Sequence, residues 1–172
     1  MACRKFPGDR GLKFKRSKKM ISSSEYKERM AKLKSNVYQG GNLVDRFDPS
    51  ITGGIDVIAA TYDFASDPEF AGVGVATSHL TGEKINRFCH IHQNMADLLA
   101  KQKMTRLYCQ EIGGCIQRCM GIDALNALSI ASFEADAQHG TSYYKHFTEF
   151  MKKVQKEDLA LVCAQTDVKG NR

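Results

Sequence analysis

Hydrophobic residues recur at helical spacing in the first third of the chain, with turn-rich segments between the repeats. Residues 22–35 predict a first helix, because Ser22 and Glu25 have the spacing of a capping box and apolar residues then recur at i, i+4 and i+7. Residues 36–45 predict a small hairpin around a glycine-rich turn. Residues 55–65 predict a second helix with an apolar stripe along one face.

The helical pattern is stronger in the rest of the chain. Gly113 and Gly114 separate the first two of three predicted helices, and Gly121 is a candidate break within the second. The predicted elements are a hairpin of residues 75–80 and 84–90, helices over 94–110, 115–138 and 142–156, and a short apolar run over 159–164. The fold class predicted from these patterns is mainly α, with small β-hairpins.

Basic residues are concentrated at the start of the chain. Residues 1–19 contain eight Lys or Arg and one acidic residue, whereas the remaining residues carry 17 basic and 18 acidic side chains. The body is close to neutral, so its charge gives no case for a nucleic-acid partner. We interpret 1–19 as a basic, disordered leader; a nucleic-acid arm, a transit peptide and an extension ahead of a true start at Met20 are the alternatives. A single domain is then expected over 20–172, a normal domain length.

The cysteines and the hydropathy indicate a cytoplasmic protein. No run of about 18 apolar residues is present, so no membrane span is predicted. The first residues contain no apolar segment of the secretory type. We therefore expect the six cysteines to be reduced thiols or metal ligands rather than disulfides.

The sharpest local feature is the pentapeptide Cys115-Ile116-Gln117-Arg118-Cys119. Two cysteines at i and i+4 on a helix share one face, with Cβ atoms about 6 Å apart. Both thiolates could then reach one zinc ion or one iron–sulfur cluster, and Arg118 would favour the thiolate form. The alternative is a pair of buried, inert cysteines, which are common in protein cores. The spacing alone leaves both interpretations open.

Two ligands do not complete a metal site. Residues 89–92 alternate as Cys-His-Ile-His, so His90 and His92 would share one face of an extended segment. The alternative is two histidines that form ordinary hydrogen bonds in a polar loop. A Gly-rich nucleotide-binding loop and a GxSxG motif are both absent from the sequence. The remaining candidate ligands are Cys89, Cys109, His139 and His146.

Three stretches together carry a resemblance to a known family. They are residues 76–88 (ATSHLTGEKINRF), residues 114–127 (GCIQRCMGIDALNA), and residues 154–159 (VQKEDL) with the later Thr166-Asp167 and Lys169-Gly170. The chain resembles, over residues 22–172, the N-terminal region of the 4-hydroxyphenylacetate 3-hydroxylase flavoprotein family, and within it the 4-hydroxybutyryl-CoA dehydratase branch.

The resemblance implies a fold, cofactors and site residues. Its fold is an acyl-CoA-dehydrogenase-like N-terminal helical domain, followed in the family by a middle β-domain and a C-terminal helical bundle. The dehydratase branch is a homotetramer that binds FAD and a [4Fe–4S] cluster held by three cysteines and one histidine. It converts 4-hydroxybutyryl-CoA, a CoA thioester, to crotonyl-CoA and isomerises vinylacetyl-CoA. Cys115 and Cys119 match two of the cluster cysteines, and Gln117 matches a glutamine close to the active site.

The sequence also departs from the family, whose chains are much longer. The histidine and the third cysteine of the cluster, and most flavin-binding positions, fall in the family beyond the region matched here. We therefore expect this chain alone to be inactive, and to act as a homo-oligomer or with a separately encoded remainder of the enzyme. The alternatives are a fragment of a flavin-dependent aromatic hydroxylase and a non-catalytic metal-binding or interaction domain.

Overall fold

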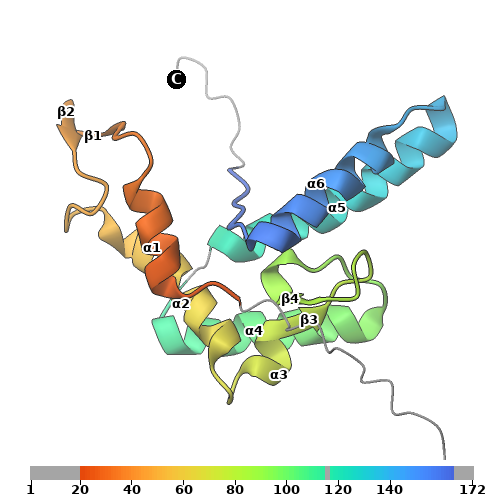
Figure 1. Cartoon of the computed structure of the whole chain (residues 1–172), viewed down its shortest axis with the longest axis horizontal. Coiled ribbons are helices and arrows are strands. Elements are labelled where there is room, and N and C mark those ends of the chain that lie inside the picture. The colour runs from red at the N-terminus through yellow and green to blue at the C-terminus, as the bar shows by residue number, and fades with distance from the viewer. Residues whose placement is uncertain (1–19, 115–116, 165–172) are drawn as a thin grey trace, which may run out of the picture.

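The computed structural model describes residues 20–114 and 117–164 and is mainly helical (Figure 1). The leader predicted over residues 1–19 and the first of the two motif cysteines, Cys115, lie outside the described residues. The elements in chain order are α1 (Ser23–Ala31), β1 (Val37–Gln39), β2 (Asn42–Val44), α2 (Thr52–Ser66), α3 (Ala71–Gly74), β3 (Val75–Thr77), β4 (Lys84–Asn86), the 3-10 turn η1 (Arg87–Cys89), α4 (Met95–Ile112), α5 (Gln117–His139) and α6 (Tyr143–Glu157). The prediction of a mainly α fold with small hairpins is confirmed.

The helix starts follow from local capping chemistry. The Ser22 hydroxyl accepts the Glu25 backbone N–H, and the Glu25 carboxylate accepts the Ser22 N–H, so the predicted capping box is present. The Asn94 side chain caps α4 by accepting the backbone N–H of Asp97. Gly113 ends α4 in the left-handed conformation (φ 73°), which glycine adopts without strain.

The two sheets are minimal. β1 pairs with β2 and β3 with β4, both antiparallel, with Gln39 opposite Asn42 and Thr77 opposite Lys84 at the turn ends. Both predicted hairpins are therefore present. The second is shorter than expected, because the chain leaves the sheet after Asn86 and turns into η1.

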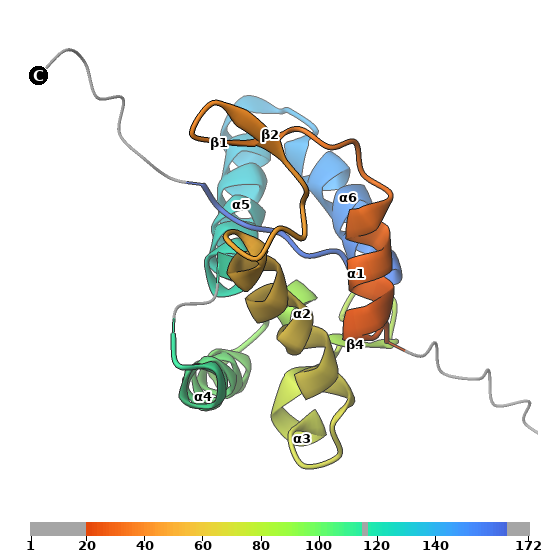
Figure 2. The same ribbon diagram turned by 90° about the vertical axis from the view of Figure 1, so that its left-hand side faces the viewer.

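Three packed clusters hold the helices together. The first gathers Phe64 and Tyr108 with Phe88, Met104 and Ile122, and so joins α2, η1, α4 and α5. The second packs α6 against η1, the segment after it and α5 through Met151, Val154, Cys89, Ile91 and Leu125. The third joins the segment before α1 to α1 and α2 through Ile21, Tyr26, Ala59 and Tyr62. In Figure 2, the segment that follows α6 runs across α5.

Several elements differ from the sequence prediction. The first helix ends at Ala31 rather than near residue 35, and α2 begins at Thr52 rather than at residue 55. The short helix α3 was not predicted, since four residues with two glycines show no helical period. The predicted break near Gly121 was wrong: from Gln117 to His139, α5 is continuous. The glycine serves a close backbone approach instead of a kink.

The described residues 20–114 and 117–164 contain no helix that is both long and apolar enough to cross a membrane.

Candidate functional site

The motif residues lie at the start of α5 and point in different directions. Gln117, the first residue of the helix, is exposed. Cys119 is half-buried and packs against the cluster around Phe64 and Tyr108. Residues two positions apart on a helix do not face each other. Gln117 and Cys119 are therefore presented on different sides of the helix, and the predicted pairing of Cys119 with Cys115 involves a residue outside the described part of the chain.

Arg118, between them, is the most buried charged residue near the motif, with 1% of its surface exposed. Its Nη1 donates to the Thr61 hydroxyl at 2.7 Å, and its Nη2 forms an ion pair with Asp158 at 2.9 Å. The guanidinium carbon also lies 4.3 Å from the centre of the Tyr62 ring and 5.2 Å from that of Phe88. One side chain thus links α5 to α2, to η1 and to the residue that ends α6.

The cluster around Arg118 is hydrogen-bonded on several sides. The Arg118 Nη2 also donates to the Leu159 carbonyl at 3.3 Å, and the Tyr62 hydroxyl donates to the Asp158 carbonyl at 3.0 Å. Gln155 of α6 donates to the Cys89 carbonyl and accepts the Ser78 hydroxyl. Because a buried charge is tolerated only when it is paired and hydrogen-bonded, these partners are what permit an arginine in the core.

Burial and the arginine charge set the ionisation of this cluster. Burial alone would lower the pKa of the Arg118 guanidinium, but the acidic groups around it, Asp158 among them, raise that pKa overall, so Arg118 is charged. Burial raises the pKa of the Cys89 thiol to about 12, although the nearby Arg118 charge opposes this. Burial likewise raises the pKa of the Tyr62 hydroxyl. Cys89 is therefore a neutral thiol and unsuited to nucleophilic chemistry.

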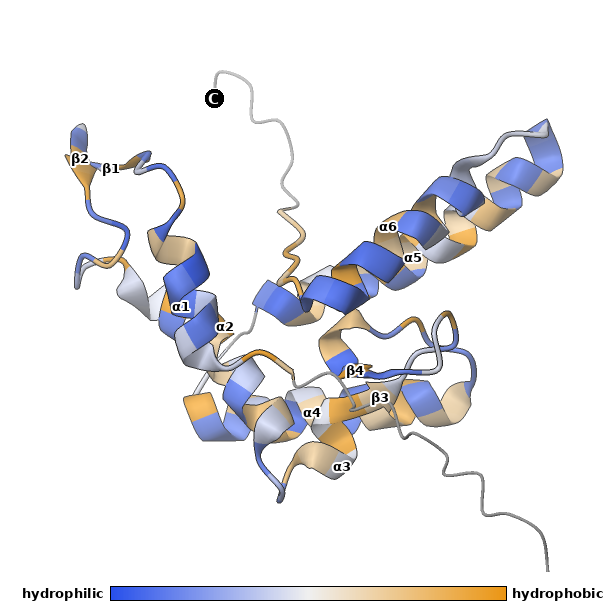
Figure 3. Cartoon of the chain, viewed as in Figure 1, coloured by the Kyte–Doolittle hydropathy of each residue, from blue (hydrophilic) through white to orange (hydrophobic). Residues whose placement is uncertain are grey.

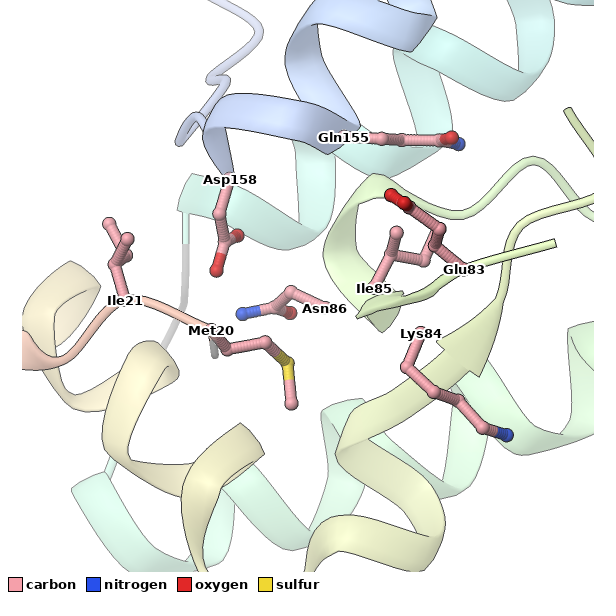
Figure 4. Close-up of a pocket in the computed structure, with 8 residues that line it drawn as sticks. All are labelled: Met20, Ile21, Glu83, Lys84, Ile85, Asn86, Gln155 and Asp158. Atoms are coloured by element: carbon pink, nitrogen blue, oxygen red, sulfur yellow. The ribbon is translucent and has the colours of Figure 1, made fainter. Parts of the chain in front are cut away.

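Asp158 also lines a small pocket (Figure 4). Its lining includes Met20, Glu83, Asn86, Gln155 and Asp158, and the figure shows the Asn86 amide and the Asp158 carboxylate turned toward each other. Asn86 Oδ1 accepts the Phe88 backbone N–H, which leaves its amide nitrogen as the group facing the pocket. Within the described residues, neither that nitrogen nor Asp158 Oδ2 has a hydrogen-bond partner. Such a donor and acceptor pair suits one ordered water rather than a substrate.

The other predicted ligands do not form a metal site with Cys119 among the described residues. His90 and His92 do lie together, with ring centres 6.1 Å apart, as the alternating pattern suggested. Burial lowers the pKa of both imidazoles. His139 ends α5, about 30 Å along the helix from Cys119 at 1.5 Å per residue, and so cannot share a metal with it. Among residues 20–114 and 117–164, no group of three or more His, Cys, Asp or Glu side chains could hold a metal ion.

Two further features lie beside the motif, namely Cys109 and a groove on α5. Cys109 of α4, one of the candidate ligands, packs against the same cluster as Cys119. An open groove on α5 is lined by Met120, Asp123, Ala124, Ala127 and Cys163. Lys101 of α4 forms an ion pair with Asp123 at its edge, at 2.7 Å. Cys119 is the one motif cysteine that the structure describes, and one thiolate does not by itself hold a [4Fe–4S] cluster.

Comparison with known proteins identifies the family. The sequence model described as 4-hydroxyphenylacetate 3-hydroxylase N terminal matches residues 22–172. The chain belongs to this family. It is 40% identical over 155 residues to a 4-hydroxybutyryl-CoA dehydratase/vinylacetyl-CoA Δ-isomerase of Clostridium aminobutyricum, across 89% of this chain and 32% of that protein.

A solved structure agrees with the assignment. An oxygen-tolerant archaeal 4-hydroxybutyryl-CoA dehydratase from N. maritimus superposes with a TM-score of 0.78 at 41% identity, over 82% of this chain and 28% of that one. This member of the 4-hydroxyphenylacetate 3-hydroxylase N-terminal family thus spans about a third of the length of the relatives it matches. Sequence reasoning found the family and the motif. It did not predict that Arg118 is buried and links several elements, because the hydrogen-bond partners of Arg118 lie 29 to 57 residues away in the sequence.

Proposed function

We propose that this chain forms the N-terminal portion of a dehydratase acting on a 4-hydroxyacyl-CoA thioester, and that it is inactive without the remaining parts of the fold. The observation that carries the proposal is the 40% identity to a 4-hydroxybutyryl-CoA dehydratase over 155 residues, a stretch that includes nearly the whole of this chain. The similarity extends to the backbone, with a TM-score of 0.78 to a second dehydratase.

In this proposal the start of α5 contributes the chain's share of the active site. Cys115 and Cys119 are two cysteine ligands of a [4Fe–4S] cluster, and the exposed Gln117 faces the substrate. Among residues 20–114 and 117–164, no group of three or more His, Cys, Asp or Glu side chains could hold a metal ion, which fits a cluster whose ligands come from more than this part of the chain. The remaining ligands and the FAD site are assigned to the other parts of the family fold.

The exposed apolar residues of α5 and α6 support the need for further protein. These two helices run side by side as a hairpin that projects from the rest of the molecule, and apolar positions lie along it (Figure 3). An open groove between the helices is lined by residues that include Leu128, Tyr143 and Phe147. The exposed large apolar side chains of the hairpin are Leu128, Ile130, Phe133, Tyr143 and Phe150. Exposed apolar patches of this kind mark protein interfaces.

The hairpin predicts self-association of the isolated chain. We expect light scattering to show oligomers whose mass grows with protein concentration, because burying these side chains removes apolar surface from water. Replacing Ile130 and Phe133 by Ser should shift the distribution toward monomer. A monodisperse monomer of the wild-type chain at high concentration would contradict the assignment of this face as an interface.

The test of the function is complementation. The chain is mixed anaerobically with the part of the Clostridium aminobutyricum dehydratase that follows the matched region, together with FAD, iron and sulfide. Formation of crotonyl-CoA from 4-hydroxybutyryl-CoA is then measured. We expect activity only in the mixture, and its loss in Cys119→Ser and Cys115→Ser. Cys109→Ser, a half-buried cysteine outside the motif, is the matched control and should retain activity.

Two other results would point away from the proposal. Zinc bound to the purified chain, and lost in Cys115→Ser, would indicate a simpler metal site. Aromatic hydroxylation by the mixture, with no crotonyl-CoA formed, would place the chain in the hydroxylase branch of its family.

A further inference from the structure

Arg118 stands inside the cysteine motif but points away from the site that the motif would form. Its neighbours Gln117 and Cys119 are exposed and half-buried, whereas Arg118 is in the core. Successive residues on a helix differ by about 100° around its axis, so the direction of one side chain fixes the directions of the next two. Whatever holds Arg118 therefore also sets where Gln117 and Cys119 point.

We propose that Arg118 is a positioning residue: its ion pair with Asp158 fixes the rotation of the first turns of α5 and so aims Gln117 and Cys119. The inference rests on the proposed function, in which these two residues belong to the active site.

The Arg118 contacts come from directions that a rotated helix could not satisfy. Nη1 is bound by Thr61 of α2, and Nη2 by Asp158 and by the Leu159 carbonyl beyond α6. The guanidinium lies over the Tyr62 ring. A planar group with fixed partners on two sides defines one orientation, which a single point contact would not do.

Asp158 is held in a conformation that favours glycine or asparagine. It ends α6 with φ 48°, and it is the one non-glycine residue with positive φ among residues 20–114 and 117–164. Its carbonyl accepts the Tyr62 hydroxyl, which fixes the backbone as well. A glycine would relieve the backbone there but would remove the carboxylate. The presence of Asp158 at this position fits a requirement for its side chain.

A second contact holds the same face of α5. Gly121 lies one turn after Arg118, and the backbone of Leu161 packs directly on it. A Cβ at residue 121 would lie 2.6 Å from the Leu161 carbonyl carbon and closer still to its oxygen. The segment from Asp158 to Leu161 thus contacts α5 at two successive turns, at Arg118 and at Gly121.

A core ion pair could also be structural only, and the double variant R118M/D158N separates the two roles. Removing one partner of a buried ion pair is costly because it leaves an uncompensated buried charge, whereas replacing both partners by uncharged residues leaves none. The double variant is therefore expected to keep most of the global stability while losing the orientation. D158N alone removes the charge and keeps the shape. D56N, the same change in the exposed ion pair between Lys27 and Asp56, is the matched control.

The experiment uses the full chain and two local measurements. Backbone amide hydrogen exchange is compared between residues 120–125 of α5 and residues 104–108 of α4. Alkylation of Cys119 by iodoacetamide is compared with that of Cys109. We expect D158N and R118M/D158N to speed exchange at 120–125 at least tenfold more than at 104–108. We also expect the Cys119 to Cys109 alkylation ratio to change at least threefold. D56N should change neither.

The outcomes decide the proposal in either direction. The proposal would be overturned if the amide exchange rate changed equally in α4 and α5. It would also be overturned if R118M/D158N exchanged at residues 120–125 as slowly as wild type. R118K retains the charge but lacks the planar fork, and its exchange at 120–125 should fall between wild type and the double variant. If D158N does not fold, the comparison of R118K with wild type decides in the same way. These measurements need no cluster or flavin, so failed complementation with normal local results would count against the proposed function and not against the role of Arg118.

Discussion

Gly121→Ala tests whether the segment after α6 closes onto α5 as the structure shows. The added methyl group would lie 2.6 Å from the Leu161 carbonyl carbon, so the segment has to retreat by about 1 Å to reach ordinary van der Waals separation. Overpacking of this kind costs about 1–3 kcal/mol. Moving Leu161 also pulls Leu159 and Asp158 away from Arg118, and loss of a buried ion-pair partner costs up to about 3–5 kcal/mol.

One opposing effect has to be included. Alanine is better than glycine inside a helix by about 1 kcal/mol, so a glycine with free space around it gains stability when replaced. With partial rather than complete loss of the ion pair, we expect Gly121→Ala to destabilise the chain by about 2–4 kcal/mol. For a chain of this length that lowers the melting temperature by roughly 5–15 °C.

The assay is urea unfolding followed by circular dichroism at 222 nm, with Gly54→Ala as control. Gly54 is in the first turn of α2 and has no atom within 4 Å of a built Cβ, so this change should be neutral or stabilise by up to about 1 kcal/mol. Opposite signs for the two variants are the expected result. A Gly121→Ala protein as stable as wild type would refute the close packing of Leu161 on α5.

Three further perturbations test other parts of the structure. Ser22→Ala removes one half of the capping box and should lower the free energy of unfolding by about 0.5–2 kcal/mol, measured by urea titration, whereas an unchanged midpoint would mean that the cap is not formed in solution. The Cys89 thiol, with its pKa raised to about 12, should be alkylated at pH 8 roughly a thousandfold more slowly than in guanidinium-unfolded chain, and alkylation as fast as at Cys109 would contradict its burial. Burial lowers the pKa of His90 below its ordinary 6.5, so as the pH falls the unfolded chain binds a proton that the folded chain does not. The free energy of unfolding should therefore fall as pH drops from about 7 toward 5, and the His90→Gln variant should show a shallower fall. An equal slope in both proteins would contradict the assignment.

Much of the secondary structure could be read from local signals. The capping box at Ser22 and the left-handed glycine at Gly113 mark a helix start and a helix end within a few residues of sequence. The boundaries that were missed lacked such a signal. α3 contains two glycines and has no period, and the first turn of α2 contains Gly53 and Gly54, which disfavour a helix on propensity alone.

The site could be predicted only in part. The residue types and spacing of Cys115, Gln117 and Cys119 were sufficient to mark the motif, and the family resemblance gave them roles that stay predictions. The role of Gly121 was misjudged as a break in the helix. In a sequence a glycine shows only that a side chain is missing, and the reason for it here is the approach of Leu161, 40 residues later.

The sequence by itself determined the longer helices, the capping box at Ser22, the motif and the family, because each depends on residues close together in the chain or on a pattern shared with relatives. The tertiary structure alone decided which side of α5 is buried. Apolar side chains occur on several sides of that helix, with Ile122 and Leu125 in the core and Ile130 and Phe133 exposed, so its pattern does not select one face. The choice follows from Arg118, whose charge can be buried only where Thr61, Asp158 and the Leu159 carbonyl meet, and only the folded chain brings those groups together.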